Sequence, residues 1–315
     1  MTRHLNIGTR GSELALFQAH AVAGLLRVHT GTECDIVIIK TSGDLLAEAP
    51  LSQVGGKRLF VKEIEDALLS GAVDLAVHSS KDMPAVLPAG LAIAAVLPRE
   101  DPRDALVLPA DSLPSLGDTP RIGTSSVRRI AQLRRMLPGA TFEPVRGNLG
   151  TRLRKLDEGQ FDALVLAAAG LRRLGQESRI SALLPVAACV PAPGQGIIAI
   201  EIRSDDAGTL ALVAKIDDAL AGAALVAERT VVEQLGGGCQ MPIGAYAATT
   251  GGVLTLTAIV LSIDGRRAAA ATQSGPLTDA AAIGMRAAQE LLAGGAREIL
   301  AEVDSERAGV EGLQP

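Results

Sequence analysis

The chain has 315 residues, of which 48% are hydrophobic and 21% charged, and its net charge is −5. This composition is typical of a globular protein with room for two or three domains, and it excludes a disordered or fibrous chain. Aromatic residues make up only 2%, so the core must be built from Leu, Ile, Val and Ala.

No segment of the sequence predicts export, membrane insertion or a metal site. Residues 1–8 lack the apolar stretch of a secretory signal, and the longest apolar runs, such as residues 163–171, are too short to cross a bilayer. The widely spaced Cys34, Cys189 and Cys239 fit neither a disulfide framework nor a zinc site, and the four histidines form no metal-binding pattern. We therefore expect a cytoplasmic protein with reduced thiols, no metal and no membrane contact.

In chain order, the first predicted elements belong to a pattern that occurs twice. A strand ending near residue 9 leads through a turn of small residues into a helix over 13–28, and a strand ending near residue 124 leads in the same way into a helix over 127–136. In both, the first N–H groups of the helix are left for an anion. The segments 71–77 and 159–165 form a second repeat, each a helix end followed by an apolar strand. Together the repeats predict two α/β lobes of related design.

The strands between these helices predict sheets that are covered on both faces. Segments 36–39, 75–77 and 163–166 are almost continuously apolar, which is typical of mostly parallel sheets. Ligands of such sheets bind at the carboxyl ends of the strands. The proline-containing segments 98–102 and 191–196 predict two crossings between the lobes, as in a hinged pair.

After residue 206 the pattern changes to that of a third, smaller α+β domain. A helical stretch over 209–235 precedes a glycine-rich loop around Cys239, and alternating strands from 253 to 262 and a helix over 280–292 follow. Glycines let the backbone approach a ligand closely, so the sequence predicts a displayed thiol. An inert cysteine in a tight turn is the alternative.

Charge is unevenly distributed along the chain. Residues 121–179 contain eleven arginines and one lysine against five acids, so that this stretch carries +7 and the remainder −12. Guanidinium groups bind carboxylates and phosphates in bidentate fashion, which predicts a polyanionic ligand. Nucleic acid is disfavoured because only Phe142 and Phe161 are available to stack on bases. Some of these arginines, such as Arg134, Arg135 and Arg154, fit solvated helix faces instead.

Residues 78–84 (HSSKDMP) place a lysine and an aspartate where the strand over 75–77 ends. Lys81 and Asp82 are therefore expected at the carboxyl end of that strand, although capping of a turn is an equally simple role for Asp82. Residues 55–63 form a glycine loop that enters a helix. This loop lacks the spacing and the Lys-Ser/Thr pair of a phosphate-binding P-loop.

Seven motifs in the same order resemble the porphobilinogen deaminase family. They are NIGTRGS at 6–12, GGK at 55–57, HSSKDMP at 78–84, GTSSVRR at 123–129, RGN with TRL at 146–153, PGQG at 193–196 and GCQMPIGAY at 238–246. The match runs nearly from end to end, and the conjunction of motifs is far more specific than any one of them.

The resemblance implies a transferase that condenses four porphobilinogen molecules head to tail, with loss of ammonia, to give hydroxymethylbilane. It also implies a dipyrromethane cofactor held by a thioether to Cys239, and no nucleic acid or membrane partner. The implied fold is two lobes like those of type II periplasmic binding proteins plus a cofactor-carrying domain. We place these units at residues 1–98 with 197–216, at 102–193 and at 217–315, and we expect a monomer.

The family's functional residues map onto matching positions of this sequence. Asp82 takes the catalytic position, and Lys57 and Phe60 lie in the active-site loop, where Gln53 and Arg58 depart from the family pattern. Substrate carboxylates are assigned to Arg10, Arg152 and Arg173. The cofactor-binding positions are Lys81, Ser12, Thr124, Ser125, Ser126, Arg128, Arg129, Arg146 and Gln195.

Two other functions compete with this interpretation. A solute-binding module without chemistry would share the fold, but it needs neither a cytoplasmic location nor a displayed thiol. A thiol hydrolase that uses Cys239 would need a histidine partner, and His78 is the nearest in the sequence.

Overall fold

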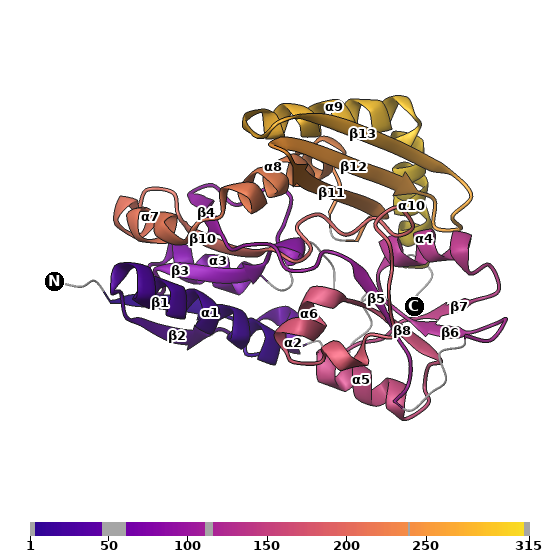
Figure 1. Cartoon of the computed structure of the whole chain (residues 1–315), viewed down its shortest axis with the longest axis horizontal. Helices are drawn as coiled ribbons and strands as arrows, with labels where there is room; N and C mark the ends of the chain where they lie inside the picture. The colour runs from indigo at the N-terminus through magenta and orange to yellow at the C-terminus, as the bar shows by residue number, and fades with distance from the viewer. Residues whose placement is uncertain (1–3, 46–60, 111–115, 239, 312–315) are drawn as a thin grey trace.

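The computed structural model describes residues 4–45, 61–110, 116–238 and 240–311 (Figure 1). Three sheets organise this part of the chain, with strand orders β2-β1-β3-β10-β4, β7-β6-β8-β5-β9 and β11-β12-β13. Figure 1 shows two α/β lobes next to each other, with a third unit above them. The predicted fold class, two α/β lobes and a small α+β domain, is confirmed.

The first lobe is a five-stranded sheet with helices on both faces. One face packs under Ala19, Val22 and Leu26 of α1, and the other under Ile64 and Leu68 of α3. Its strands are β1 (Leu5–Thr9), β2 (Cys34–Ile38), β3 (Leu75–Ser79), β4 (Leu91–Val96) and β10 (Ile198–Arg203). Its helices are α1 (Glu13–Thr30), α2 (Ser42–Leu45), α3 (Lys62–Leu69) and α7 (Ala207–Val213).

The second lobe repeats this plan. Leu133 of α4 packs on one face of its sheet, and Leu153 and Leu156 of α5 pack on the other. The strands are β5 (Asp104–Val107), β6 (Arg121–Gly123), β7 (Thr141–Glu143), β8 (Ala163–Ala167) and β9 (Ala182–Leu183). The helices are α4 (Val127–Met136), α5 (Leu149–Asp157) and α6 (Ala168–Arg173).

The internal repeat seen in the sequence is present in the structure. Strands β1, β2 and β3 pair in the same parallel order as β6, β7 and β8. An aspartate before the third strand secures the first strand in each lobe, since Asp74 Oδ2 accepts from the Asn6 N–H at 2.8 Å and Asp162 Oδ2 from the Arg121 N–H at 2.7 Å. The two lobes therefore share local interactions as well as topology.

Both sheets are mixed, whereas the sequence predicted mostly parallel ones. β10 runs antiparallel to β3 and β4, and β5 runs antiparallel to β8 and β9. The reason is the path of the chain, because β5 and β10 each enter a sheet from the other lobe through a crossing. We propose the boundaries given above for the three units, since they leave every strand with its own sheet.

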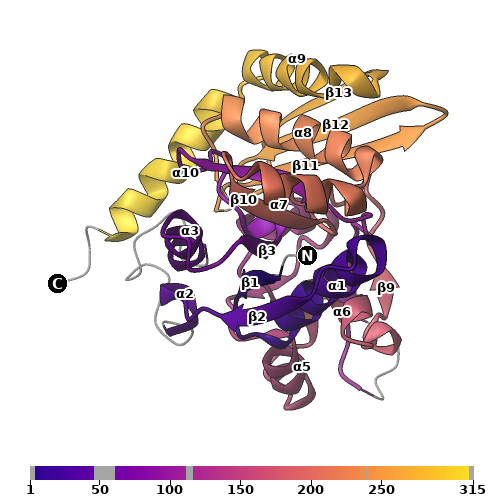
Figure 2. The ribbon, with the colours of Figure 1, turned by 90° about the vertical axis from the view of Figure 1, so that its left-hand side faces the viewer.

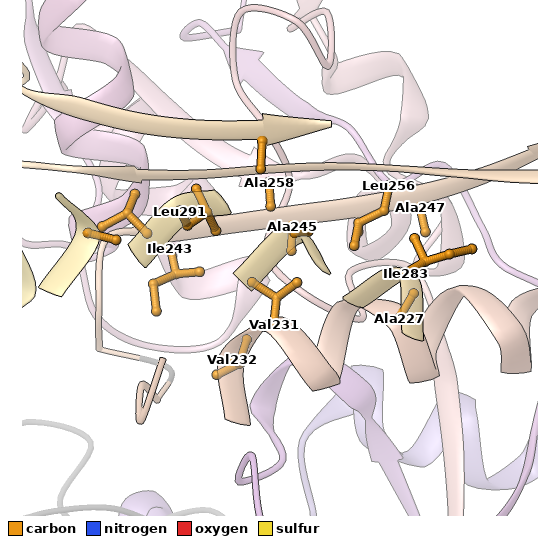
Figure 3. Packing of buried hydrophobic residues seen from close by; sticks show 14 of the residues in the cluster. Ala227, Val231, Val232, Ile243, Ala245, Ala247, Leu256, Ala258, Ile283 and Leu291 are labelled. Carbon is orange, nitrogen blue, oxygen red and sulfur yellow. The ribbon is translucent and has the colours of Figure 1, made fainter. Parts of the chain in front are cut away.

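The third domain is an antiparallel sheet covered on one face by two helices. Ala227 and Val231 of α8 and Ile283 of α9 pack against the alanine-rich strands, as Figure 3 shows. Its elements are α8 (Ala219–Gln234), β11 (Ile243–Thr250), β12 (Val253–Leu261), β13 (Ala268–Pro276), α9 (Ala280–Ala293) and α10 (Ala296–Glu311).

Two features of this region differ from the predicted elements. The helix expected over 209–235 is divided, because Asp218 caps a new helix by accepting from the Ala221 N–H at 2.7 Å. Helix α10, which the sequence pattern did not predict, extends outward from the third domain (Figure 2).

A buried carboxylate ties both crossings to the third domain. Glu228 of α8 is fully buried, and its two oxygens accept from the Arg99 guanidinium, each at 2.7 Å. The same oxygens accept from the backbone N–H groups of Gly194 and Ala247, also at 2.7 Å. Arg99 lies in the first crossing, Gly194 in the second and Ala247 in β11. One side chain therefore joins three segments that are far apart in the sequence.

Glu228→Ala should lower the free energy of unfolding by about 3–5 kcal/mol, because it leaves the largely buried Arg99 guanidinium without a counter-charge. Urea unfolding at neutral pH measures this change. Glu302→Ala is the matched control, since Glu302 pairs with Arg267 at a half-exposed position and its loss should cost at most about 1 kcal/mol. Equal losses in the two variants would contradict the role given to Glu228.

Candidate functional site

A cleft lies where the three units meet. The first lobe supplies the residues that follow β3, and the second lobe supplies the start of α4. The third domain supplies the C-terminal part of α8 and the glycine-rich loop that follows it. The lining residues are Ser80, Lys81, Met83, Ala85, Ser126, Arg128, Ala192, Pro193, Arg229, Val232, Gly238, Met241 and Ile243. A ligand in this cleft would contact two lobes and the third domain at once.

The turn after β3 is held from several sides. Residues Ser80–Asp82 form a single 3₁₀ turn, in which the Ser80 N–H donates to the Ile197 carbonyl at 3.0 Å. The Gln18 amide of α1 exchanges hydrogen bonds with the Ser79 hydroxyl at 2.9 and 3.1 Å. Gly194 has a φ of +73°, and a Cβ there would lie 2.5 Å from Ser80 Oγ. The turn is thereby fixed, and Asp82 is exposed at its end.

Lys81 lies in a strongly charged environment. Burial lowers the pKa of Lys81 to about 8, while Asp82 and Asp104 oppose this change and Arg129 and Arg128 reinforce it. The first and second lobes therefore place their charged groups close enough to act on one another. The prediction that Lys81 and Asp82 follow β3 is confirmed by the position of the turn.

The sequence did not single out Asp104, the residue that organises the arginines. Asp104 begins β5 and is fully buried, and its Oδ2 accepts from Arg128 Nη1 at 2.7 Å. Its Oδ1 accepts from Arg129 Nη2 at 2.8 Å and from the Gln195 amide at 3.0 Å. Cys189 Sγ lies 3.3 Å from Oδ2. The one signal in the sequence was an acid at the start of an apolar strand.

This network determines the charge state of Asp104. Burial alone would raise the pKa of the Asp104 carboxyl, but the guanidinium groups of Arg128 and Arg129 hold it well below its ordinary value. Arg128 also donates to the Val190 carbonyl at 2.7 Å, and Arg129 to the Val165 carbonyl at 2.8 Å. Both guanidinium groups are thus held in fixed orientations before any ligand binds.

The other predicted arginines differ in their partners. Arg152 donates from Nε to the Gly147 carbonyl at 2.8 Å, and burial and Arg129 lower its pKa, opposed by Asp82. Arg173 donates to the Gly196 carbonyl at 2.6 Å, and Arg10 forms an ion pair with Asp44 at 2.5 Å. Within residues 4–45, 61–110, 116–238 and 240–311, the partly buried Arg146 side chain forms no hydrogen bond or ion pair.

The predicted hydroxyl residues mark the two helix starts. Ser12 Oγ accepts from the Ala15 N–H and Ser126 Oγ from the Arg129 N–H, each at 3.4 Å, so both serines cap their helices. Thr124 is buried beneath this turn, and its Oγ1 accepts from the Ser126 N–H at 3.3 Å. Ser125 donates to the Val145 carbonyl at 2.9 Å. The hydroxyls of the second lobe thus shape the loop that precedes Arg128 and Arg129.

Several predicted residues lie outside the described part of the chain. These residues are Lys57 and Phe60 of the expected active-site loop, Gln53 and Arg58 in the same segment, and Cys239. Gly238, the residue before Cys239, lines the cleft. Sequence analysis also missed Arg229, which lines the cleft and donates to the carbonyls of Pro84 and Ala85 at 2.8 Å.

Two kinds of site are absent from the described residues. No helix there is both long enough and apolar enough to span a bilayer. No group of three or more His, Cys, Asp or Glu side chains within those residues is arranged to hold a metal ion.

Family models match most of the chain. One described as "Porphobilinogen deaminase, dipyromethane cofactor binding domain" matches residues 5–211, and another described as "Porphobilinogen deaminase, C-terminal domain" matches residues 223–293. Curated relatives named porphobilinogen deaminase match over nearly the full length. The protein of Syntrophobacter fumaroxidans is 48% identical over 96% of this chain and 98% of its own, and that of Acidithiobacillus ferrooxidans is 49% identical over 96% and 99%.

Similarity to solved structures is weaker. The methionine-binding protein MetQ has a TM-score of 0.44 at 14% identity, over 68% of this chain and 89% of its own. The VFT2 domain of Bordetella pertussis BvgS has a TM-score of 0.41 at 18% identity, over 68% and 86%. Likenesses at this level carry no argument about what the chain does.

Asp104→Asn should lower the free energy of unfolding at pH 7 by about 3–5 kcal/mol, because two buried guanidinium groups lose their counter-charge. The pKa of Asp104 is lower in the folded state, so its contribution is fully present above its ordinary pKa and is lost as the pH falls below that value. The difference in free energy of unfolding between the wild type and Asp104→Asn should therefore become smaller as the pH falls from about 5 to about 3.

Urea unfolding over this pH range provides the measurement. Asp205→Asn, a change at an exposed position, is the control and should leave the unfolding curves unaltered. A difference that stays constant with pH would show that the ionised Asp104 carboxylate is not what stabilises the arginines.

Proposed function

This chain belongs to the porphobilinogen deaminase family, and we infer that it condenses four porphobilinogen molecules head to tail, releases ammonia at each step and yields hydroxymethylbilane. The observation that carries this inference is identity of 48–49% over nearly the whole length of relatives named porphobilinogen deaminase. The cleft supports it independently, because its cations suit a substrate that bears an acetate and a propionate on every ring.

The lining of the cleft fits a dipyrromethane cofactor. Arg128 Nε and Ser80 Oγ are buried and have no hydrogen-bond partner within the described residues, and both residues line the cleft. Buried donors of this kind call for an acceptor, and the carboxylate oxygens of a pyrrole would serve. Lys81, Ser126 and Arg128 are therefore the residues we assign to holding the cofactor. When bound, dipyrromethane supplies the pyrrole carbon to which the first porphobilinogen is joined.

We propose Cys239 as the attachment point for the cofactor. Burial raises the pKa of Cys189 to about 12, and burial together with Glu33 and Asp35 raises that of Cys34 to about 11, so both are poor nucleophiles. Cys239 is the third cysteine of the chain and directly follows Gly238, which lines the cleft.

Asp82 is the residue to which we assign the chemistry. Loss of ammonia from porphobilinogen leaves a cationic azafulvene-type electrophile, and the attack of a pyrrole carbon creates a second cation that must lose a proton. A carboxylate near the pyrrole nitrogens stabilises both cations and directs the proton transfers. Asp82 is exposed at the end of a fixed turn, where its charge acts on Lys81 and Arg152.

The remaining arginines would bind the carboxylates of the substrate and of the growing chain. Arg152 lies in the first half of α5, Arg146 lies just before that helix, and Arg173 lies beside the second crossing. Arg10 would exchange its contact with Asp44 for one with a substrate carboxylate. Four residues act through the shape of the two helix starts, namely Ser12, Thr124, Ser125 and Arg129. Gln195 acts through its hydrogen bond to Asp104.

The competing functions gain less support. A thiol hydrolase would need a histidine in the cleft, but His78 is buried with Glu201 and does not belong to its lining. A solute-binding module leaves the exposed Asp82 without a role. We further propose a monomer, because residues of one chain line the cleft. We also propose that it acts in the cytoplasm, where the free thiols of Cys34 and Cys189 would stay reduced.

The intact mass of the denatured protein tests cofactor attachment. We expect the wild-type protein to exceed its sequence mass by two deaminated porphobilinogen units and Cys239→Ser to show the bare sequence mass. Cys34→Ser is the control and should retain the excess. Bare mass in the wild type, with no adduct after addition of porphobilinogen, would overturn the proposed function.

Asp82→Asn should lower kcat for porphobilinogen consumption by about 100-fold or more, since it removes the only charge-stabilising carboxylate we place in the reaction. The residue is exposed, so the melting temperature should stay close to that of the wild type. Near-normal turnover in this variant would remove Asp82 from the mechanism while leaving cofactor attachment standing.

A further inference from the structure

A buried carboxylate and a buried histidine lie side by side in the first lobe. Glu201 of β10 is fully buried, and Nε2 of the His78 ring lies 3.0 Å from its Oε2. His78 in β3 is also buried. Neither Glu201 oxygen nor His78 Nε2 has a hydrogen bond of good geometry within that part of the chain.

Two other buried acids, Glu228 and Asp104, differ from Glu201 in their hydrogen bonding. Both oxygens of Glu228 accept two hydrogen bonds each, and Asp104 is surrounded by two guanidinium groups and an amide. Buried polar groups without such hydrogen bonds do not recover the cost of removing them from water. Stability therefore does not explain the pair of His78 and Glu201, and a role in function is the alternative.

The position of the pair suggests what that role is. In the antiparallel pairing of β3 with β10, Ala199 lies opposite His78 and Glu201 lies opposite Ala76. His78 and Glu201 are thus diagonal neighbours on the face of the sheet that α3 covers. Their contact fixes the lateral position of β3 against β10 at the end of β3 that leads into the catalytic turn.

The same strand pair anchors the turn itself. Two residues after His78, the Ser80 N–H donates to the carbonyl of Ile197, the residue that precedes β10. A change in the contact between His78 and Glu201 is therefore transmitted directly to Lys81 and Asp82. We propose that the buried pair of His78 and Glu201 positions the Ser80–Asp82 turn for the condensation reaction, an inference that rests on the proposed function.

The expected effect is on turnover. A displacement of about 1 Å in a reacting group can cost about 100-fold in rate, so His78→Gln and Glu201→Gln should each lower kcat by about 10- to 100-fold. KM should change by less than about threefold, because the arginines that bind carboxylates belong to other elements. The double variant should lose no more than either single variant, since each change already breaks the same contact.

The experiment compares kcat, KM, melting temperature and intact mass across these variants. Ile200→Val is the matched control, because Ile200 lies in the same strand but packs in the core on the opposite face, beneath α1. It should lower the melting temperature and leave kcat unchanged. If the His78 and Glu201 variants, like this control, lowered the melting temperature and kept the kcat of the wild type, the pair would be structural and the proposal wrong.

A second background tests whether the pair acts through Asp82. In Asp82→Glu, whose carboxylate is already displaced, adding His78→Gln should reduce the residual kcat by less than about threefold. If His78→Gln lowered kcat in this background by about 10- to 100-fold, as in the wild type, the pair would not act by positioning Asp82. Should Glu201→Gln fail to fold, His78→Gln in the two backgrounds decides the question.

Failure of the proposed function is distinguishable from failure of this inference. The function fails if the wild-type protein neither carries the cofactor mass nor consumes porphobilinogen, and the inference falls with it. If the wild type does both and the two variants turn over normally, only the role of the pair is refuted.

Discussion

Compensation of buried charge is the constraint on which the rest of this structure depends. Asp104 and Glu228 are both fully buried, and each stands where segments from different units meet. Asp104, at the start of β5, accepts hydrogen bonds from α4 and from the second crossing. Glu228, in the third domain, accepts hydrogen bonds from both crossings. Since an unpaired buried charge is costly, the three units can adopt this arrangement only when every partner is in place.

This constraint also prepares the site for its ligand. The buried guanidinium groups of Arg128 and Arg129 would repel one another, but Asp104 between them offsets part of that charge and fixes their orientation. Groups that are oriented in advance need not reorganise when an anion binds. The buried Nε of Arg128 remains without a partner within the described residues, which makes it available to an anionic ligand. In Arg128, Nη1 and Nη2 bind Asp104, whereas Nε is left for the ligand.

The elements that the sequence predicted correctly are those fixed by local signals. Ser12 and Ser126 cap helices that begin where the small-residue turns predicted, and helix 127–136 has the predicted bounds. The predictions that were wrong or missing concern features that depend on residues far away in the sequence. The antiparallel direction of β10 follows from a return through the second lobe, and the role of Asp104 depends on arginines 24 and 25 residues away. Arg128 and Arg129 were identified as site residues, but the place of Asp104 at the start of an apolar strand does not by itself indicate that it is their counter-ion.

Among the cations at the cleft, Lys81 is the one whose charge responds to a ligand. The arginines stay protonated at any physiological pH, whereas burial brings the pKa of Lys81 down to about 8. An anion that enters the cleft would raise this pKa, so binding of a carboxylate draws a proton onto Lys81. Lys81 directly precedes Asp82 in the Ser80–Asp82 turn. The same turn therefore carries the ammonium group that would hold the ligand and the carboxylate assigned to the chemistry. A growing polycarboxylate would therefore keep Lys81 protonated, so that the positive charge beside Asp82 is retained while the chain grows.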